Sequence, residues 1–239
     1  MGEIILSTRG LSRSFGGLQA VDAVDFNLPV GEIRALIGPN GAGKSTFVNM
    51  LIGRIPPTAG VVKFKDQDIS ALPAHVRVAQ GMAYTFQITS VFSNLSVAEN
   101  VALAARRRLG RDKIAVQSEV KHALDRVGLA DRMAQIAGDL AYGHQRLLEI
   151  AMGLAQKPQL LILDEPTQGL ADSEVAEFKQ LIRELVSETT ILLIEHNMNV
   201  VMELADTITV LNFGKILAEG TPAEIHANPQ VQAAYLGTG

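Results

Sequence analysis

The sequence of 239 residues contains no cysteine. Disulfide bonds, thiolate metal sites and cysteine nucleophiles are therefore excluded, and the composition suits a reducing compartment. Long hydrophobic runs are missing too, since the longest ones, such as 160–163 and 191–194, are far too short to cross a bilayer. The first ten residues, MGEIILSTRG, lack the charged start and long apolar stretch of a secretory signal. We expect a chain that is soluble by itself and meets any membrane through a partner.

A surplus of positive charge is also absent. Lysine and arginine number 21 against 25 aspartate and glutamate residues, which gives a net charge of −4. Because nucleic-acid binders use many cations to neutralise phosphates, we expect no nucleic-acid partner. Hydrophobic residues make up 47% of the chain and charged residues 19%, a composition typical of a globular protein with a sizeable core.

Short apolar runs alternate along the chain with segments of helical periodicity. The runs 160–163 and 191–194 are apolar at consecutive positions, and 33–37 is apolar except at Arg34, as in strands buried on both faces. The segments 24–28 and 61–65 have the pattern of short antiparallel strands between glycine and proline turns. We predict an α/β fold with a mostly parallel central sheet and an N-terminal antiparallel β subdomain.

The middle of the chain has a different pattern. Residues 96–137 are helical in periodicity almost throughout, and apolar residues at helical spacing continue over 147–154. No repeat or low-complexity linker separates this part from the rest. We predict one domain over residues 1–239, with a helical subdomain, approximately 88–159, inserted in its core.

Residues 38–46 read GPNGAGKST and stand between an apolar run and the helical segment FVNMLIG. They match the G-x-x-x-x-G-K-[ST] pattern of a phosphate-binding loop in its strand–loop–helix context. In such a loop the backbone N–H groups bind phosphate oxygens, Lys44 binds the β- and γ-phosphates, and Ser45 offers a hydroxyl to Mg²⁺. A glycine-rich turn without ligand is the alternative, but the fixed positions match by chance in only about one chain in a hundred. The predicted nucleotide-binding residues are Gly38, Pro39, Asn40, Gly41, Ala42, Gly43, Lys44, Ser45 and Thr46.

A second motif, LLILDE at 160–165, is a buried strand that ends in two carboxylates. Such residues lie at the carboxyl edge of the sheet, where ligands of open α/β folds bind. We predict that Asp164 binds Mg²⁺ and that Glu165 polarises the attacking water. Taken alone, the motif would more often be a strand that merely reaches solvent, but the phosphate loop upstream favours the catalytic interpretation.

Two further polar residues follow apolar runs. His196 ends ILLIEH and is predicted to donate a hydrogen bond to the γ-phosphate, while Gln87 ends MAYTFQ and is predicted to reach Mg²⁺ or the water with its amide. A lone histidine or glutamine is more often a structural residue. Their places after predicted strands favour the catalytic interpretation.

The order of these motifs resembles the ABC ATPase family over nearly the whole chain. LAYGHQ at 140–145 is the discriminating segment, because it is similar to the family's LSGGQ signature, which other P-loop enzymes lack. GLAD at 169–172 is similar to the family's D-loop. The resemblance implies a P-loop fold of the ABC ATPase type that hydrolyses ATP with Mg²⁺. It also implies a head-to-tail dimer with two nucleotides at the interface.

In that dimer the signature would contact ATP bound to the second subunit. This sequence departs from the family at Ala141, which replaces the signature serine and its hydroxyl, and at Ala171, which stands at the usual D-loop aspartate beside Asp172. An aromatic residue near the N-terminus usually stacks on adenine, and Phe15 is the candidate, with a plain core phenylalanine as the alternative. The residues assigned to the signature contact are Leu140, Ala141, Tyr142, Gly143, His144 and Gln145.

The details are similar to ATPases of branched-chain amino acid importers. FGGLQAVDAVDF at 15–26, TFQ at 85–87, the LAYG form of the signature and the C-terminal EGTPAEIHANPQVQAAYLG, a candidate helix, support this. The implied partners are a second ATPase subunit, identical or different, two integral-membrane permease subunits and, indirectly, a solute-binding protein. The implied location is the cytoplasmic face of the bacterial inner membrane. The alternatives are the ATPase of a lipopolysaccharide-type exporter and a soluble, non-transport ABC ATPase.

Overall fold

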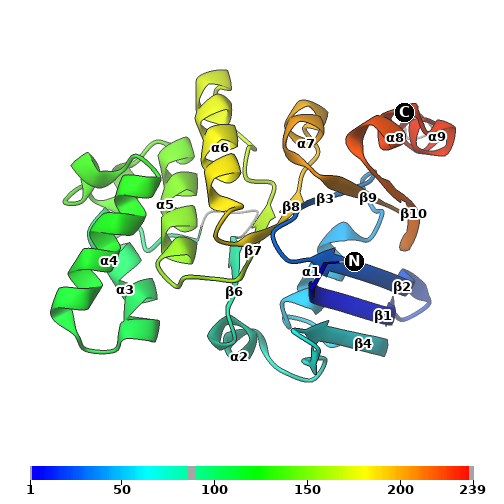
Figure 1. The fold of residues 1–239 in the computed structure, drawn as a ribbon, viewed down its shortest axis with the longest axis horizontal. Helices are drawn as coiled ribbons and strands as arrows, with labels where there is room; N and C mark the ends of the chain where they lie inside the picture. The colour runs from blue at the N-terminus through cyan, green and yellow to red at the C-terminus, as the bar shows by residue number, and fades with distance from the viewer. Residues whose placement is uncertain (1, 86–89, 237–239) are drawn as a thin grey trace.

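Within residues 2–85 and 90–236, which the computed structural model describes, the chain forms two β-sheets flanked by helices (Figure 1). The strands are β1 (Ile4–Phe15), β2 (Leu18–Pro29), β3 (Ile33–Ile37), β4 (Ala59–Phe64), β5 (Gln67–Asp68), β6 (Met82–Thr85), β7 (Leu160–Asp164), β8 (Thr190–Ile194), β9 (Thr207–Asn212) and β10 (Lys215–Gly220). The helices are α1 (Lys44–Leu51), α2 (Ala74–Ala79), α3 (Val97–Leu109), α4 (Lys113–Arg126), α5 (Tyr142–Leu154), α6 (Asp172–Leu185), α7 (Met198–Leu204), α8 (Pro222–Ala227) and α9 (Pro229–Leu236).

The larger sheet has the strand order β10-β9-β3-β8-β7-β6. Its strands run parallel except β10, which pairs antiparallel with β9 at one edge. The smaller sheet, β2-β1-β4-β5, is antiparallel throughout. The predicted mostly parallel central sheet and N-terminal antiparallel subdomain are both confirmed. The antiparallel strands are longer than the sequence pattern suggested, because β1 and β2 continue toward each other to the turn at residues 16–17.

The central strands are buried on both faces, as their consecutive apolar residues predict. Along β7, Leu161 and Leu163 join the apolar core under helices α3–α6. Leu160 and Ile162 point the other way, into the core shared with α1 and the antiparallel sheet. Successive side chains of a strand alternate between faces, so the central sheet forms the middle layer of the molecule.

Helices α3, α4 and α5 form a group that follows β6 and precedes β7, on the left in Figure 1. A reciprocal cap begins α3, since Ser96 N donates to Glu99 Oε2 at 2.8 Å and Glu99 N donates to Ser96 Oγ at 3.2 Å. Asp112 Oδ1 accepts from Ala115 N at 3.0 Å at the start of α4. Such caps typically contribute about 1 kcal/mol each. The helical pattern at 96–137 is confirmed, while the subdomain boundaries at 88 and 159 stay a prediction.

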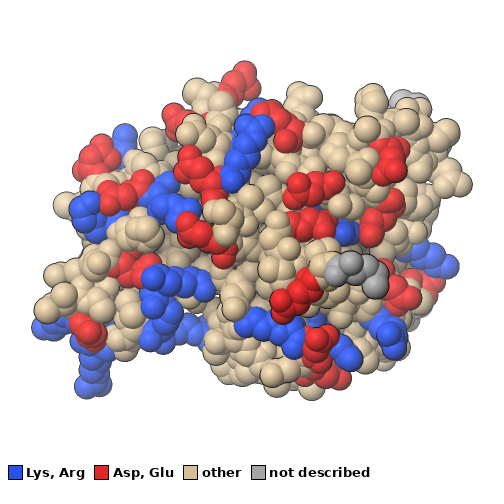
Figure 2. Space-filling view, viewed as in Figure 1, with Lys and Arg blue, Asp and Glu red and all other residues tan. Residues whose placement is uncertain are grey.

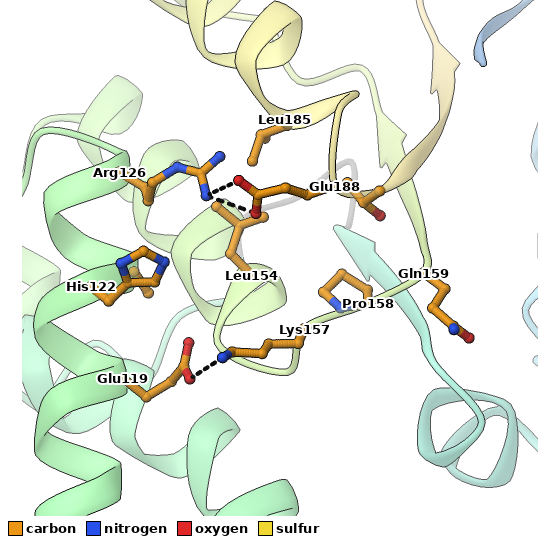
Figure 3. Close-up of a pocket in the computed structure, with 11 residues that line it drawn as sticks. Glu119, His122, Arg126, Leu154, Lys157, Pro158, Gln159, Leu185 and Glu188 are labelled. Carbon is orange, nitrogen blue, oxygen red and sulfur yellow. Dashed lines mark hydrogen bonds and ion pairs between the residues drawn. The ribbon is translucent and has the colours of Figure 1, made fainter. Parts of the chain in front are cut away.

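Two ion pairs connect α4 to the amino ends of the central strands (Figure 3). Arg126 Nη1 lies 3.0 Å from both carboxylate oxygens of Glu188, and Lys157 Nζ lies 3.5 Å from Glu119 Oε2. These residues border a cavity of about 270 Å³ whose lining includes Gln159, just before β7. Ligands of open α/β sheets bind at the opposite, carboxyl edge. The cavity therefore lies at the edge of the sheet opposite the predicted nucleotide site.

The C-terminal helices cover the remaining part of the central sheet. Ile225 of α8 and Val231 of α9 join an apolar cluster with residues of α7 and β9. The C-terminal helix that the sequence suggested is thus present, divided in two at Asn228. On the face shown in Figure 2, basic and acidic side chains are interspersed over the helices and sheets. Within the described residues, the helices all fall short of the length and hydropathy of a membrane span.

Candidate functional site

The predicted phosphate loop, 38–46, connects β3 to α1, which is the context its pattern requires. Gly43 directly precedes α1 with a φ of +100°, and a Cβ added there would lie 2.3 Å from the carbonyl oxygen of Ala20. Both the left-handed conformation and this contact exclude a side chain. The glycine therefore lets the loop turn into α1 so that the unpaired N–H groups of the first helical turn face the loop.

An open cavity of about 430 Å³ lies beside this loop, within the usual size range of small-molecule sites. Residues 40–46 line it together with Glu165 and the segments 18–20 and 213–214. Among the described residues, the lining includes none of the signature segment 140–145. The cavity thus joins the loop to one predicted catalytic carboxylate, but not to the predicted signature.

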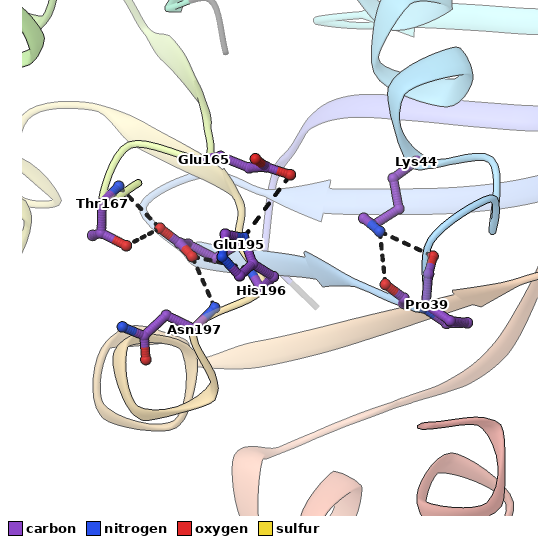
Figure 4. Close-up of polar contacts among 8 residues, drawn as sticks. Pro39, Lys44, Glu165, Thr167, Glu195, His196 and Asn197 are labelled. Carbon is purple, nitrogen blue, oxygen red and sulfur yellow. Dashed lines mark hydrogen bonds and ion pairs between the residues drawn. The ribbon is translucent and has the colours of Figure 1, made fainter. Parts of the chain in front are cut away.

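Lys44 is the last fixed residue of the loop pattern before Ser45, and the loop backbone holds its ammonium group. Its Nζ donates to the carbonyl oxygens of Gly38 at 2.6 Å and Pro39 at 3.1 Å (Figure 4). Burial lowers the pKa of Lys44, and the nearby charges of Glu165 and Asp164 act in the opposite direction. The lysine is therefore close enough to both acidic residues to sense their charge.

The strand order explains why residues far apart in sequence meet here. β8 lies between β3 and β7, and Ile194 at its end is paired with Leu36 of β3 and Asp164 of β7. The phosphate loop, Glu165 and His196 all follow the carboxyl ends of these adjacent parallel strands. The topology therefore places His196 between the loop and the carboxylates, which the sequence alone does not give.

Asp164 is buried, with a relative exposure of 7%, and it accepts a hydrogen bond from the Tyr84 hydroxyl, 2.6 Å from its Oδ2. Burial raises the pKa of Asp164, whereas the Tyr84 hydrogen bond lowers it. Burial, together with the bond to Asp164, raises the pKa of Tyr84. Sequence reasoning missed Tyr84, because only the pairing of β6 with β7 brings it next to this carboxylate.

Glu165 is a non-glycine residue in the left-handed region, with a φ of +48°. Such residues are uncommon and cluster at functional sites. The conformation is held by a hydrogen bond from Glu165 N to the carbonyl oxygen of Ile194 at 2.9 Å. Glu165 Oε1 lies 3.9 Å from Nδ1 of His196, whose side chain is largely exposed. The two predicted catalytic side chains therefore share one edge of the site.

The predicted residue Gln87 lies outside the described residues. Phe15, at the end of β1, is not among the residues that line the cavity, and the Arg13 guanidinium covers one face of its ring at 4.6 Å from the centroid. The aromatic ring that does line the cavity is Phe213, which sequence reasoning missed because it stands in the short β9–β10 turn and carries no motif. Its side chain is 84% exposed.

The signature segment lies at the start of α5, with Ala141 as the residue before the helix and no side-chain cap. Gly143 lies close to the first turn of α6, since an added Cβ would lie 2.4 Å from Oε1 of Glu174. The other carboxylate oxygen of Glu174 accepts from Ala171 N at 2.8 Å at the start of α6. Within one chain, the signature thus packs against the predicted D-loop.

Comparison with known proteins identifies this arrangement. A family model described as "ABC transporter" matches residues 21–168, which include the phosphate loop, the signature and both carboxylates. The chain belongs to the ABC transporter ATP-binding family. Like other members, this ABC protein is an ATPase, and the resemblance seen in the sequence is confirmed. A second model, "Branched-chain amino acid ATP-binding cassette transporter", matches residues 215–239.

Curated relatives align with this ABC ATPase over nearly its whole length. It is 42% identical to the high-affinity branched-chain amino acid transport ATP-binding protein LivG of Escherichia coli K12, with 99% of each chain covered. It is 40% identical to the corresponding BraF of Pseudomonas aeruginosa, again with 99% of each covered. The lipopolysaccharide export system ATP-binding protein LptB of E. coli K12 is 33% identical, with 97% of each covered.

Solved structures support the fold. The ADP conformation of MJ1267, an ATP-binding cassette of an ABC transporter, is similar with a TM-score of 0.87 at 27% identity, covering 98% of this chain and 99% of that one. The cbiO1 structure from Clostridium perfringens, part of the ABC transporter complex cbiONQ, gives a TM-score of 0.86 at 27% identity, with 98% and 99% covered. The predicted ABC ATPase fold is therefore confirmed.

Proposed function

We propose that this ABC ATPase powers the import of branched-chain amino acids or related small solutes. The observation that carries the proposal is the higher full-length identity to LivG and BraF, 42% and 40%, than to LptB at 33%. The match of residues 215–239 to the branched-chain amino acid cassette model supports the same assignment. An LptB-like export function is the second candidate, favoured only by the more distant similarity.

ATP binding is assigned to the loop 38–46. Lys44 now donates to two carbonyl oxygens of the loop, so it is held beside the position that the β- and γ-phosphates would take. Phosphate oxygens would replace those carbonyls as charge-assisted acceptors, which form the stronger hydrogen bonds. The backbone N–H groups at the start of α1 add further donors.

The donor set beside the loop fits Mg²⁺. Ser45 offers a hydroxyl and Asp164 a carboxylate, and Mg²⁺ prefers few protein oxygens together with phosphates and water. Asp164 Oδ2 is bound to Tyr84, which fixes the orientation of this carboxylate. We assign Ser45, Asp164 and Gln87 as the residues that would hold the ion, whose charge would neutralise the phosphates.

Hydrolysis is assigned to Glu165 and His196. Glu165 lines the cavity beside the loop, which supports the proposal that it would orient the attacking water as a general base. His196 lies 3.9 Å from it and would donate to the γ-phosphate. Positioning and electrostatic stabilisation suffice for this chemistry, so no covalent intermediate is needed.

A second ATPase subunit, identical or different, would complete each site with its signature segment. This proposal is supported by the absence of residues 140–145 from the described lining of the cavity. Two permease subunits would hold the pair at the cytoplasmic face of the inner membrane, and a solute-binding protein would deliver the solute from outside. ATP would favour the closed dimer through its higher affinity for that state.

Uptake by cells tests the proposed function. Deletion of the gene should abolish high-affinity uptake of radiolabelled leucine, isoleucine and valine. The wild-type gene should restore uptake, and a Glu165→Gln gene expressed to the same level should not. Normal amino acid uptake together with lipopolysaccharide retained in the inner membrane would instead support the LptB-like alternative.

A further inference from the structure

Glu195 is a buried acidic residue that none of the roles above uses. It follows β8 directly and has a relative exposure of 1%. Burying a carboxylate is costly unless its oxygens are well hydrogen-bonded. A residue of this kind beside a reaction site therefore requires a physical explanation.

The two carboxylate oxygens of Glu195 bind two different segments (Figure 4). Oε1 accepts from Thr167 N at 3.1 Å and from the Thr167 hydroxyl. Oε2 accepts from His196 N at 2.9 Å and from Asn197 N at 3.0 Å. All four partners are donors, which suits an ionised carboxylate because that group only accepts.

The segments that Glu195 joins carry the two proposed catalytic side chains. Thr167 stands two residues after Glu165. The N–H group that donates to Oε2 of Glu195 is the backbone N–H of His196, the residue that carries the imidazole. The link holds the backbone from which the exposed His196 side chain projects. Asn197 extends the arrangement, because its side chain accepts from Asn199 N at 3.1 Å and caps α7.

A backbone contact parallels this side-chain link. Glu165 N donates to the carbonyl oxygen of Ile194. The residue that follows β7 is therefore hydrogen-bonded to the last residue of β8. The result is a closed unit in which Glu165 Oε1 and His196 Nδ1 lie 3.9 Å apart. A displacement of about 1 Å at a reacting group is enough to cost a large factor in rate.

We propose that Glu195 is a positioning residue for ATP hydrolysis, which fixes His196 and Glu165 relative to each other through its bonds to Thr167, His196 and Asn197. The inference rests on the proposed function, since it requires Glu165 and His196 to act on ATP. Glu195 itself lies under the site and is not assigned a contact with the nucleotide.

The Glu195→Gln variant of the full-length protein tests this role. Glutamine keeps the shape but replaces one acceptor oxygen with an NH₂ donor, which must face the donors of one of the two segments. We expect kcat to fall about tenfold or more while the Kd for ATP changes less than about twofold, because the phosphate loop is untouched. The control is Asp206→Asn, which alters a carboxylate that accepts from Ile33 N at 2.8 Å at the amino end of β3. It should leave kcat unchanged.

A second pair of variants keeps the test valid if Glu195→Gln does not fold. Thr167→Val removes only the hydroxyl donor and should lower kcat, whereas Thr167→Ser retains that donor and should restore it. A purely structural role would instead lower the melting temperature of Thr167→Val and leave its kcat unchanged. That result would overturn the inference.

Coupling to His196 gives the decisive measurement. If Glu195 acts through His196, then Glu195→Gln combined with His196→Ala should reduce kcat by less than the product of the two single effects. Fully multiplicative effects would overturn the inference. If Glu165→Gln and His196→Ala each hydrolyse ATP like the wild type, the proposed site fails as a whole. If Glu165→Gln and His196→Ala are inactive while Glu195→Gln hydrolyses ATP like the wild type, only the role of Glu195 is refuted.

Discussion

The carboxyl edge of the central sheet and the signature segment differ in how the chain builds them. At the sheet edge, three adjacent strands bring the phosphate loop, Glu165 and His196 together, and the left-handed Glu165 is held by a hydrogen bond across strands. The signature at the start of α5 instead packs through Gly143 against Glu174 and stays out of the lining of the cavity. The first region carries the residues proposed for binding and hydrolysis, whereas the second lies outside the described lining of the cavity in its own chain.

This difference agrees with the proposed composite site, in which one subunit provides the phosphate loop and carboxylates and the other provides the signature. In the proposed function the sheet edge supplies the groups for binding and chemistry, so its substitutions should change hydrolysis or ATP affinity. The signature would supply contacts only across a dimer, so its substitutions should change association instead. The predictions below test that separation, in decreasing order of effect.

Glu165→Gln should produce the largest effect, a loss of ATP hydrolysis of about 100-fold or more, because general-base catalysis typically contributes that much. ATP binding should be retained, and the ATP-bound dimer should accumulate. Phosphate release and size-exclusion chromatography with ATP measure the two effects. Glu188→Gln, which alters an ion-paired glutamate at the amino end of β8, is the control. Turnover equal to that of the wild type would remove Glu165 from its role.

Lys44→Ala should weaken ATP binding about 10- to 100-fold, since hydrogen bonds to charged groups typically contribute about 1.5–3 kcal/mol. Titration calorimetry with ATP and Mg²⁺ measures the Kd. Lys215→Ala, which removes an exposed lysine paired with Asp22 at 3.1 Å, should bind ATP normally. An unchanged Kd in Lys44→Ala would place the phosphates elsewhere.

Gly143→Ala should reduce ATP-dependent dimerisation about tenfold while leaving the Kd for ATP of the single chain unchanged. The added Cβ would displace the Glu174 carboxylate and break its bond to Ala171 N, which typically costs about 1 kcal/mol. Gly153→Ala in the same helix is the matched control, because its Cβ would meet Leu161 at 3.4 Å and Ala83 at 3.8 Å, which are ordinary van der Waals distances. If Gly143→Ala dimerises like this control, the signature does not contribute to the interface.

Tyr84→Phe should have the smallest effect. Loss of the hydroxyl removes a hydrogen bond that lowers the pKa of Asp164, so this pKa rises further above its usual value. Asp164 must be ionised to hold Mg²⁺, and activity is lost as the pH falls through its pKa. The acidic limb of the pH–rate profile should therefore move to higher pH, and the Mg²⁺ requirement should rise by up to about tenfold. An unshifted profile would show that Tyr84 does not tune Asp164.

The apolar runs and the glycine-rich loop made much of this fold predictable. Residues 33–37, 160–163 and 191–194 have the pattern of strands buried on both faces, and 38–46 matches a pattern with a defined local structure. The sequence also placed Asp164 and Glu165 at a strand end. These features depend on neighbours in sequence, which is why pattern and composition suffice for them.

The remaining features depend on which strands are neighbours in space. The bond from Tyr84 to Asp164 and the place of His196 beside Glu165 follow from the order β3-β8-β7-β6, which no local pattern encodes. Glu195 was overlooked for the same reason, since its partner Thr167 lies on another strand's loop. The assignment of Phe15 to adenine stays a prediction, as does that of Gln87.

Crosslinking between two subunits tests the composite site most directly. Because the chain has no cysteine, Asn40→Cys in the phosphate loop and Ala141→Cys in the signature can be introduced together into the Glu165→Gln protein without background thiols. We predict a disulfide-linked dimer that forms on oxidation with ATP and Mg²⁺ and is absent without nucleotide. If neither the purified chain nor the assembled transporter gives an ATP-dependent crosslink between these positions, the two-subunit site is contradicted.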